Sequence, residues 1–233
     1  MPRLKVELHS HTADDPIDLI PYTAEDLIDH AASLGYQAIA ITLHHKQFDV
    51  EPLRRYAADR GIVLLPGVER TIERRHVLLI NFSAATQNVN SFTDLEALRR
   101  REKGLVVAPH PFYPKSKGLG SVADRHASLI DAVEVHGFHP VGIDIFNNRA
   151  RRWAAKFGKP LVGNGDVHRL SQLGSTYSIV DADPEPDSIC EAIRAGRVEV
   201  RSTPLSWFRL VSLLVSITIA EWRSGHHRSK NAR

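Results

Sequence analysis

Apolar and polar positions follow two patterns along this chain, and each pattern predicts one kind of strand. Residues 4–8 alternate apolar and polar side chains, as a strand with one buried face does. Residues 38–42 are almost continuously apolar, which is typical of a strand in a parallel sheet that is covered on both faces. Similar short runs predict further strands at residues 62–65, 76–80, 105–108, 132–135, 160–162, 176–180 and 198–200.

Amphipathic stretches between these runs predict helices. Thr23 precedes Glu25 and Asp26 as an N-cap precedes the acidic first turn of a helix, and Gly35 follows the last apolar position as a stop signal. Strands that alternate with helices predict a parallel sheet, either a closed barrel or an open, doubly wound sheet. Further helices are expected near residues 50–60, 92–103, 146–157 and 187–195.

Residues that can bind metals follow one predicted strand after another. His9 and His11 end the first strand, and two histidines at this spacing point to one face, where they can hold one transition-metal ion. Alone, the pair could equally be two partly exposed histidines near the N-terminus. Other strand ends carry His44, Glu69, His110, Asp166 and His168.

Candidate ligands at so many strand ends distinguish between the two kinds of sheet. An open sheet gathers its site at one switch point, whereas a barrel gathers it from the C-terminal ends of many strands. No Gly-x-Gly-x-x-Gly motif follows a strand, so a dinucleotide site has no support. The sequence therefore predicts an α/β barrel.

The composition is that of an ordinary globular domain. The 233 residues are 42% hydrophobic and 24% charged, with a formal net charge of +3, which by itself does not indicate a nucleic-acid-binding protein. Basic clusters at residues 99–101 and 149–152 fall in predicted helices, and we expect them to lie on the solvated outer faces of those helices. The single cysteine, Cys190, excludes an internal disulfide, and with no signal peptide before the first strand a cytoplasmic location is expected.

The C-terminal end has its own character. Residues 210–220 are uncharged, but a membrane span needs about 20 apolar residues. We expect residues 1–203 to form the barrel, residues 204–222 to pack on it as an apolar segment, and residues 223–233 to be a basic disordered tail. The alternative is an interfacial anchor with Trp207 and Trp222 at its ends, which would give weak contact with a membrane surface through residues 205–222.

Five motifs, in their order and spacing, resemble those of the PHP family (polymerase and histidinol phosphatase). The resemblance covers about residues 4–180, and it implies a distorted, TIM-like barrel of seven β/α units with its active site at the C-terminal strand ends. It also implies hydrolysis of phosphoesters with two or three divalent ions, manganese, zinc or iron. The motifs are His9-Ser10-His11-Thr12, Ala40-Ile41-Thr42-Leu43-His44, Pro66-Gly67-Val68-Glu69, Ala108-Pro109-His110-Pro111 and Gly165-Asp166-Val167-His168.

The resemblance also implies three sets of metal ligands. For the loop acid of the third set, Asp15 fits best, with Asp14 and Asp18 as alternatives. His9, His11, Glu69, Asp166 and His168 are the residues expected to carry catalysis. The sets are His9, His11, Glu69 and Asp166; Glu69, His76 and His110, with Glu69 bridging; and His44 and His168 with the loop acid.

Other polar residues near these motifs have open roles. Arg169 could contact the substrate phosphate or be a surface arginine. His136, after a strand, could contact phosphate or give a proton to the leaving group, or be a hydrogen-bonded barrel histidine. We expect His30, His126 and His139 to face solvent or loops.

The chain departs from the family pattern at three positions. Leu43 and His45 stand on either side of His44 where the family usually has polar or acidic residues, and Gly165 stands where it often has serine. None of these changes removes an expected ligand. They alter the surroundings of the ligands, which bears on occupancy of the third metal site.

Two classes of function follow. The first is a metal-dependent phosphoesterase that acts on a small phosphorylated metabolite or nucleotide by means of a metal-activated water. Within this class the alternative is a 5′–3′ exonuclease or oligonucleotide phosphodiesterase, which needs a basic groove beside the metals. The second class is a non-catalytic metal-binding domain at a membrane surface.

Overall fold

The computed structural model describes residues 1–114, 116–213 and 215. The helices are α1 (Ala24–Ser33), α2 (Arg54–Ala58), α3 (Phe92–Arg101), α4 (Ile145–Phe157) and α5 (Pro186–Arg194), with short 3-10 turns η1 (Glu51–Leu53), η2 (Ala84–Asn88), η3 (Gly120–Val122), η4 (Ala127–Leu129) and η5 (Leu170–Gln172). The strands are β1 (Arg3–Glu7), β2 (Ala38–Ile41), β3 (Val63–Ile72), β4 (Arg75–Ile80), β5 (Leu105–Ala108), β6 (Ala132–His136), β7 (Leu161–Asn164), β8 (Thr176–Asp181) and β9 (Val198–Ser202).

These strands form one curved sheet in the order β7-β6-β5-β4-β3-β2-β1-β8-β9. The sheet nearly closes on itself, because β7 approaches β8 through side-chain hydrogen bonds. The Gly163 amide donates to Ser178 Oγ (2.9 Å), and that hydroxyl donates to the Gly163 carbonyl (3.2 Å). A Cβ at Gly163 would lie 2.7 Å from the Tyr177 carbonyl oxygen, so glycine permits this approach. The predicted α/β barrel class is confirmed.

The alternation of strands and helices predicts a wholly parallel sheet, but four of the strand pairs are antiparallel. β3 and β4 form an antiparallel hairpin whose turn residues, Glu73 and Arg74, have positive φ angles of 47° and 69°. Such a two-residue turn matches the twist of the paired strands and replaces a helical crossover. β4 pairs antiparallel with β5, and β8 pairs antiparallel with both β1 and β9. The described sheet has nine strands, the number that the apolar runs predict, whereas the family resemblance implies seven β/α units.

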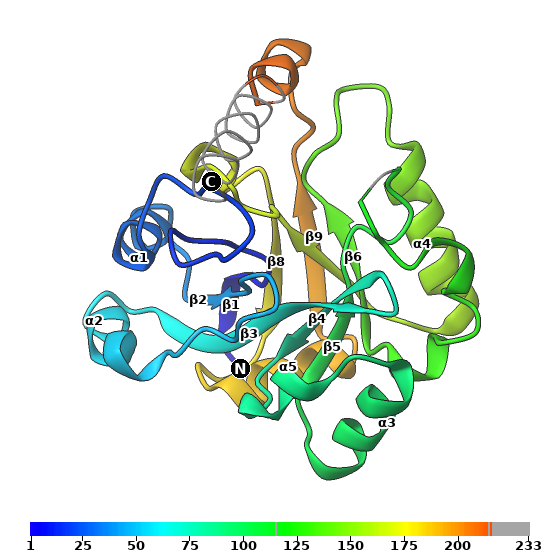
Figure 1. The fold of residues 1–233 in the computed structure, drawn as a ribbon. Helices are drawn as coiled ribbons and strands as arrows, with labels where there is room; N and C mark the ends of the chain where they lie inside the picture. Colours follow the sequence, from blue (N-terminus) through cyan, green and yellow to red (C-terminus); the bar gives the residue numbers. More distant parts are fainter. Residues whose placement is uncertain (115, 214, 216–233) are drawn as a thin grey trace, which may run out of the picture.

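Helices cover the two sides and one end of the barrel (Figure 1). α1 and α2 lie on the side of β2, where Leu27 and Ile28 pack into one buried cluster. α3 and α4 lie on the opposite side, with Leu95 and Trp153 in another. α5 lies at the end near the N-terminus, where its apolar side chains join those of β1 and β4 inside the barrel. The opposite end, at which the parallel strands finish, is left for the polar residues.

Local signals at the first helix act as predicted. The Thr23 hydroxyl accepts the Asp26 amide, and the Asp26 carboxylate accepts the Thr23 amide, which forms a capping box at the start of α1. Gly35, with φ of 74°, ends the helix. Both signals depend only on neighbouring residues, so the sequence alone predicts them.

The chain after β9 returns over the polar end of the barrel. Leu205 pairs with Pro140 across an isolated bridge, and its amide donates to the His139 carbonyl (2.9 Å). Leu205, Leu210 and Leu213 form a small buried cluster against Phe138. The remainder of the expected apolar segment, residues 214 and 216–222, and the expected basic tail 223–233 lie outside the described residues.

Candidate metal centre

The structure gathers every histidine and carboxylate expected to bind metal at one end of the barrel. The backbone brings them there because parallel strands finish at the same end. Their side chains are buried or nearly so. His9 and His11 follow β1, Asp15 lies in the next loop, His44 follows β2, Glu69 lies in β3, His76 in β4, His110 follows β5, and Asp166 and His168 follow β7.

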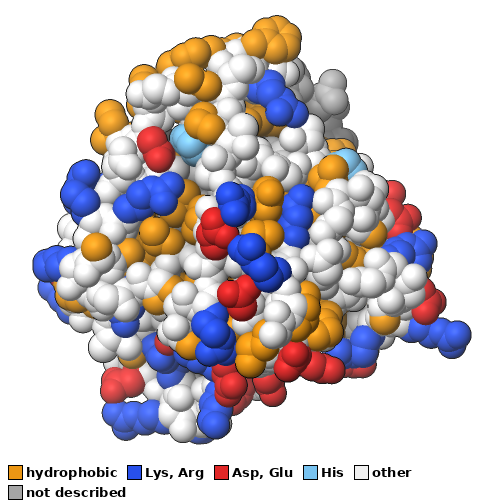
Figure 2. All heavy atoms as spheres, turned by 180° about the vertical axis from the view of Figure 1, so that it is seen from behind, with side chains coloured by type: hydrophobic (Ala, Val, Ile, Leu, Met, Phe, Trp, Pro, Cys, Tyr) orange, Lys and Arg blue, Asp and Glu red, His pale blue; other side chains and the backbone are white. Residues whose placement is uncertain are grey.

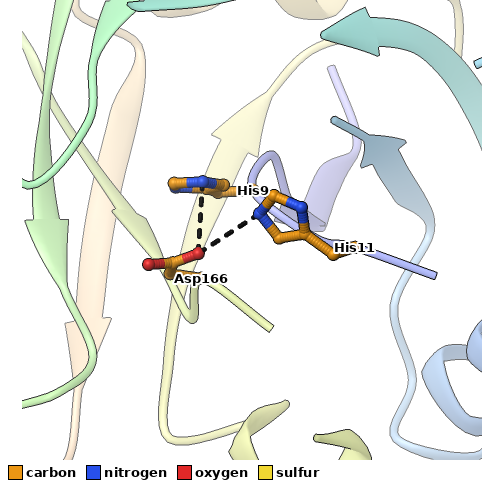
Figure 3. A group of neighbouring side chains, drawn as sticks. All are labelled: His9, His11 and Asp166. Carbon is orange, nitrogen blue, oxygen red and sulfur yellow. Dashed lines mark ion pairs between the residues drawn. The ribbon is translucent and has the colours of Figure 1, made fainter. Parts of the chain in front are cut away.

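The first group is His9, His11 and Asp166, which point toward one another (Figure 3). Asp166 Oδ1 lies 3.2 Å from His9 Nε2 and 3.4 Å from His11 Nε2. All three atoms are buried, and none makes a hydrogen bond to another described residue. Three buried donor atoms that face a common point without partners fit the coordination of a divalent cation.

Glu69 joins this group to the next through its two carboxylate oxygens. Oε2 faces His9 Nε2 (3.4 Å), His11 Nε2 (3.6 Å) and His44 Nε2 (3.1 Å). Oε1 faces His110 Nε2 (3.3 Å) and is in contact with His76 Nδ1. One carboxylate thus presents one oxygen to each of two sets of imidazoles. This is the geometry that a bridging ligand needs.

The third group contains His44, His168 and two loop acids. Asp18 Oδ2 lies 3.1 Å from His168 Nε2 and 3.6 Å from His44 Nδ1. The Asp15 carboxylate already makes several hydrogen bonds within the protein. Its Oδ2 accepts from His11 Nδ1 (2.8 Å) and from the His44 amide (2.9 Å). Its Oδ1 accepts the amides of Ile17 and Asp18. The geometry favours Asp18 as the acid beside His168, and it favours Asp15 as a residue that orients histidines.

Two histidines of the first group have a carboxylate behind the ring. His9 Nδ1 lies 2.9 Å from Glu134 Oε2, and His11 Nδ1 lies 2.8 Å from Asp15 Oδ2. A carboxylate on one ring nitrogen fixes the tautomer and aims the other nitrogen at the metal position. Glu134 was not identified from the sequence. Its position within the apolar strand β6, two residues before His136 and on the same face, was the signal available.

Glu7 is a second buried acid that the sequence pattern did not single out. Its Oε1 accepts the His9 amide and its Oε2 accepts the Gly165 amide, both at 2.9 Å. It therefore ties the backbone before His9 to the backbone before Asp166. Asn147 acts similarly on His136, because its Oδ1 accepts the His136 amide and its Nδ2 donates to the His136 carbonyl.

Charge at the centre is balanced between carboxylates and imidazoles. Burial would raise the pKa of Glu69, but the charge of His9 and hydrogen bonds from His110 and His76 hold it well below its usual value. The pKa of Asp166 is also lowered well below its usual value, because His9 and His168 outweigh burial. Burial lowers the pKa of His168, but Asp166 and Asp18 outweigh it and raise that pKa to about 9. The carboxylates therefore stay ionised, as metal ligands must be.

The backbone is strained at two of these residues. His110 has a φ of 29° and Asp166 a φ of 47°, in the left-handed region that non-glycine residues rarely occupy. Such conformations cost about 1–3 kcal/mol each, and they gather at functional sites. Here they turn both side chains toward Glu69 and His9.

The centre opens into a cavity of about 820 Å³. His136 and Arg169, the two candidate substrate contacts, both line this cavity. The Phe138 amide donates to His136 Nδ1 (2.9 Å), so the proton of the neutral ring lies on Nε2, 3.2 Å from Asp166 Oδ2. The Arg169 guanidinium donates to the His168 carbonyl through Nη1 (2.8 Å).

The histidines expected to face solvent or loops divide into two cases. His30 is partly exposed in α1, and His126 stacks on Phe92 with 3.6 Å between ring centroids. His139 lies in a loop and is only 6% exposed, so of the two expected surroundings it has loops rather than solvent. The segment around Leu205 covers it, and its Nε2 lies 2.9 Å from Ser202 Oγ.

The three departures from the family pattern lie around the centre in different ways. Leu43 is fully buried in the core between β2 and α1. His45 has a φ of 60° and its Nε2 faces Thr71 Oγ1 at 3.4 Å, away from the metal ligands. A Cβ at Gly165 would lie 2.8 Å from Val167 Cγ2, so there is no free space for the serine that the family often has.

Comparisons with known proteins agree with this geometry. The family model described as PHP-associated matches residues 144–198, and no curated protein matches the chain. PsfC from Pseudomonas syringae has a similar structure (TM-score 0.63, 16% identity, covering 96% of this chain and 99% of that one). A proposed metal-dependent phosphoesterase from Bifidobacterium adolescentis is similar at TM-score 0.61 and 15% identity, covering 82% of this chain and 96% of that one.

A third similar structure is a lesion-specific endonuclease from Pyrococcus furiosus. It has a TM-score of 0.58 and 16% identity over 85% of this chain, and the chain spans 58% of its length. Likeness at such low identity shows the fold. The fold and the site define a class of α/β barrels that collect histidines and carboxylates at their strand ends. The PHP-associated model over residues 144–198 and the shared fold support the resemblance to the PHP family that the motifs indicate.

A membrane-spanning helix is not among the elements described. Within residues 1–114, 116–213 and 215, no helix has the length and the hydropathy needed to cross a bilayer.

Proposed function

We propose that this protein is a metal-dependent phosphoesterase that hydrolyses a small phosphorylated metabolite or a nucleotide. The observation that carries the proposal is the placement of Glu69, with one oxygen toward His9 and His44 and the other toward His76 and His110. A carboxylate that can bridge two cations is what hydrolysis by a shared metal-bound water requires.

The residues present fit divalent cations. Buried atoms of His9, His11 and Asp166 face one point without hydrogen-bond partners among the described residues. We propose that these three and Glu69 hold one cation, that Glu69, His76 and His110 hold a second, and that His44, His168 and a loop acid hold a third. Imidazole and carboxylate together suit manganese, zinc or iron. When bound, such cations polarise phosphoryl oxygens and lower the pKa of a bound water, so that hydroxide is available near neutral pH.

The chain's own residues would do the remaining work. Hydrolysis forms a bond from a water oxygen to phosphorus and breaks the ester bond, and the leaving alcohol takes up a proton. The His136 Nε2–H lies at the cavity wall beside Asp166, where it could donate a hydrogen bond to a phosphoryl oxygen, while the proton of the attacking water passes to the leaving alcohol. Arg169 lines the same cavity and could hold a phosphoryl oxygen with part of its fork of donors.

The test is phosphate release by the metal-loaded protein from a panel of monoesters and diesters. Asp166→Asn is expected to lower turnover by about two orders of magnitude or more, since it removes a ligand charge and keeps the side-chain shape. Glu199→Gln, on the exposed strand β9, is the matched control and should keep full turnover. Unchanged turnover in a folded Asp166→Asn protein would contradict the proposal.

A nuclease or oligonucleotide phosphodiesterase is the second candidate, and a second cavity favours it. This cavity of about 930 Å³ is lined by Arg74, Arg75, Lys117 and Arg149, and it shares Tyr113 and Lys117 with the metal cavity. Cations beside the metals could hold phosphates farther along a strand. Arg149 is exposed on α4, as the sequence predicts, and its guanidinium lies over the Phe112 ring, 4.5 Å from the ring centroid.

The two candidates differ in their dependence on these cations and on salt. If the substrate is an oligonucleotide, Arg74→Ala with Arg149→Ala should weaken its binding at low salt, and Arg100→Ala on the exposed face of α3 should not. Binding that is absent or insensitive to salt would reject this candidate.

A metal-binding domain without catalysis, at a membrane surface, is the remaining candidate. Leu43 and His45 beside His44 are the reason to keep it. Full metal content with no turnover of any phosphoester, and vesicle binding lost on truncation before Pro204, would favour it over the phosphoesterase.

A further inference from the structure

The water-exposed apolar side chains of this protein gather around the opening of the metal cavity. Apart from Met1 and Leu34, every exposed large apolar side chain among the described residues lies in one of three segments, residues 17–19, 141–146 and 207–215. The first segment follows β1, the second follows β6 and the third follows β9. These strands all finish at the end of the barrel that holds the histidines.

The space-filling view shows part of this surface. Hydrophobic side chains lie at the top of the molecule, where the chain after β9 lies, with few charged side chains among them, while in the middle and lower parts they alternate with charged side chains (Figure 2). Contiguous apolar surface in water is unfavourable, and it marks a place where an apolar partner binds.

This apolar surface continues into the cavity. Ile17, Leu19, Ile143, Ile145 and Phe146 line the cavity and are also exposed, with Ile145 at 64% and Leu19 at 52%. Leu210 closes one side, 9% exposed. We call these six residues the apolar wall.

The polar side chains of the cavity lie mostly at its metal end. Its two cations are Lys117 and Arg169, and Arg169 directly follows the candidate ligand His168. Asp144 interrupts the apolar wall, but its carboxylate faces His139 Nδ1 at 3.8 Å and Arg151 at 4.0 Å. A ligand in this cavity therefore meets ionic groups at one end and hydrocarbon at the other.

We propose that the substrate is amphiphilic: a phosphate ester of an apolar alcohol, whose phosphate lies at the metal ligands and whose hydrocarbon chain lies along the apolar wall. The inference rests on the proposed phosphoesterase function and names its substrate class. Hydrolysis would give inorganic phosphate and the free alcohol, with the water oxygen on phosphorus and its proton on the alcohol.

A binding experiment tests the substrate class without requiring hydrolysis. Alkylphosphonates keep the anionic head and cannot lose their chain as an ester does. Calorimetry on the full, metal-loaded protein should show decylphosphonate binding at least about a hundredfold more tightly than ethylphosphonate, because each fully buried methylene strengthens binding by about three- to fourfold. Equal affinity for the two would overturn the inference.

Variants locate the effect. Leu19→Ser with Ile145→Ser should reduce the ratio of decyl to ethyl affinity by about tenfold or more. Leu34→Ser, at an exposed leucine that does not line the cavity, is the control and should leave the ratio unchanged. A ratio that does not change in the double variant would overturn the assignment to the apolar wall.

Two further outcomes distinguish the amphiphilic substrate from an amphiphilic ligand that is not hydrolysed and from a membrane contact. If decylphosphonate binds tightly but neither decyl nor ethyl phosphate is hydrolysed, the result rejects the phosphoesterase function and supports an amphiphilic ligand that is bound without hydrolysis. If the protein sediments with phosphatidylcholine vesicles, loses this in the double variant, and shows no chain-length dependence, the wall is a membrane contact and the inference is overturned.

Discussion

At the residue scale, the centre depends on acids that never face the metal position. Glu134 is fully buried, with Oε2 toward His9 Nδ1 and Oε1 without a hydrogen-bond partner among the described residues. Burying a carboxylate lowers the stability of the fold unless a neighbouring group pairs with it. Here the carboxylate pairs with His9 Nδ1 and so holds the His9 ring in one orientation.

The first prediction concerns this acid. Glu134→Gln keeps the shape but removes the charge behind His9, so affinity for the bound cation should fall by about 10–100-fold. Competition with a chromogenic chelator measures the affinity, and Glu199→Gln serves as the surface control. Affinity that matches the unaltered protein would mean that His9 needs no partner for its orientation.

The second prediction concerns Gly165. A serine there would place its Cβ 2.8 Å from Val167 Cγ2 and 3.3 Å from Glu7 Oε2. We expect Gly165→Ser to lower the free energy of unfolding by about 1–3 kcal/mol, as overpacking does. Chemical denaturation measures this, and in a Val167→Ala background the cost of the serine should shrink. Equal costs in both backgrounds would place the strain elsewhere.

The site residues that could not be predicted from the sequence have a common physical reason. His9, His11 and Asp166 stand out because they end strands, and the structure brings them together. Glu7 and Glu134 stand inside strands, where one charged residue looks like the exposed position of a half-buried strand. Whether such a residue faces solvent or the barrel interior depends on barrel closure, which turns one side of each strand inward.

At the scale of elements, strands and helices were predicted where local signals decide them. The capping box of α1 and the apolar runs of β2 and β5 depend on neighbours in sequence. The β3–β4 hairpin was missed, because its turn residues, Glu73 and Arg74, carry none of the usual Asn-Gly signal. The antiparallel pairing of β8 with β1 depends on closure and has no local signal.

The third prediction concerns α5, which covers one end of the barrel. Burial raises the pKa of the Cys190 thiol to about 12, against about 8.5 in an unfolded chain. The folded state therefore keeps a proton that the unfolded state loses, so this contribution to stability is present below about pH 8.5 and lost as pH rises from there toward 12.

Denaturation at several pH values measures this loss. Between about pH 9 and 11, stability should fall more steeply in the unaltered protein than in Cys190→Ala, by up to about 1.4 kcal/mol per pH unit. Parallel curves for the two proteins would show that the thiol titrates alike in both states. Thiol reagents should also react slowly with the native protein at pH 8, since the side chain is 1% exposed.

At the scale of the whole molecule, the centre joins parts of the sheet that do not pair. Asp166 follows β7 at one edge of the sheet, whereas His9 and His11 follow β1. The β7 edge meets β1 and β8 through the Ser10–Val167 bridge, the Glu7 carboxylate and the Gly163–Ser178 contact. A cation held by His9, His11 and Asp166 would link them as well.

The fourth prediction follows from this link. Protein purified without chelator and without a histidine tag should hold about two to three manganese, zinc or iron ions per chain by elemental mass spectrometry. Removing them should lower the thermal midpoint, because a cation that binds only the folded state stabilises it by mass action. Re-addition of manganese or zinc should restore it. Near-zero content that stays so after incubation with either metal would contradict the assignment of the centre.

The position of α5 has a consequence for the order of events in the proposed reaction. With that helix covering one end of the barrel, the cavity at the other end serves both entry and exit. If the phosphate binds at the inner end and the alcohol toward the opening, as proposed above, the alcohol departs first and inorganic phosphate last. The last complex in each turnover is then the phosphate complex. Inorganic phosphate, as the product released last, should therefore inhibit competitively with respect to substrate.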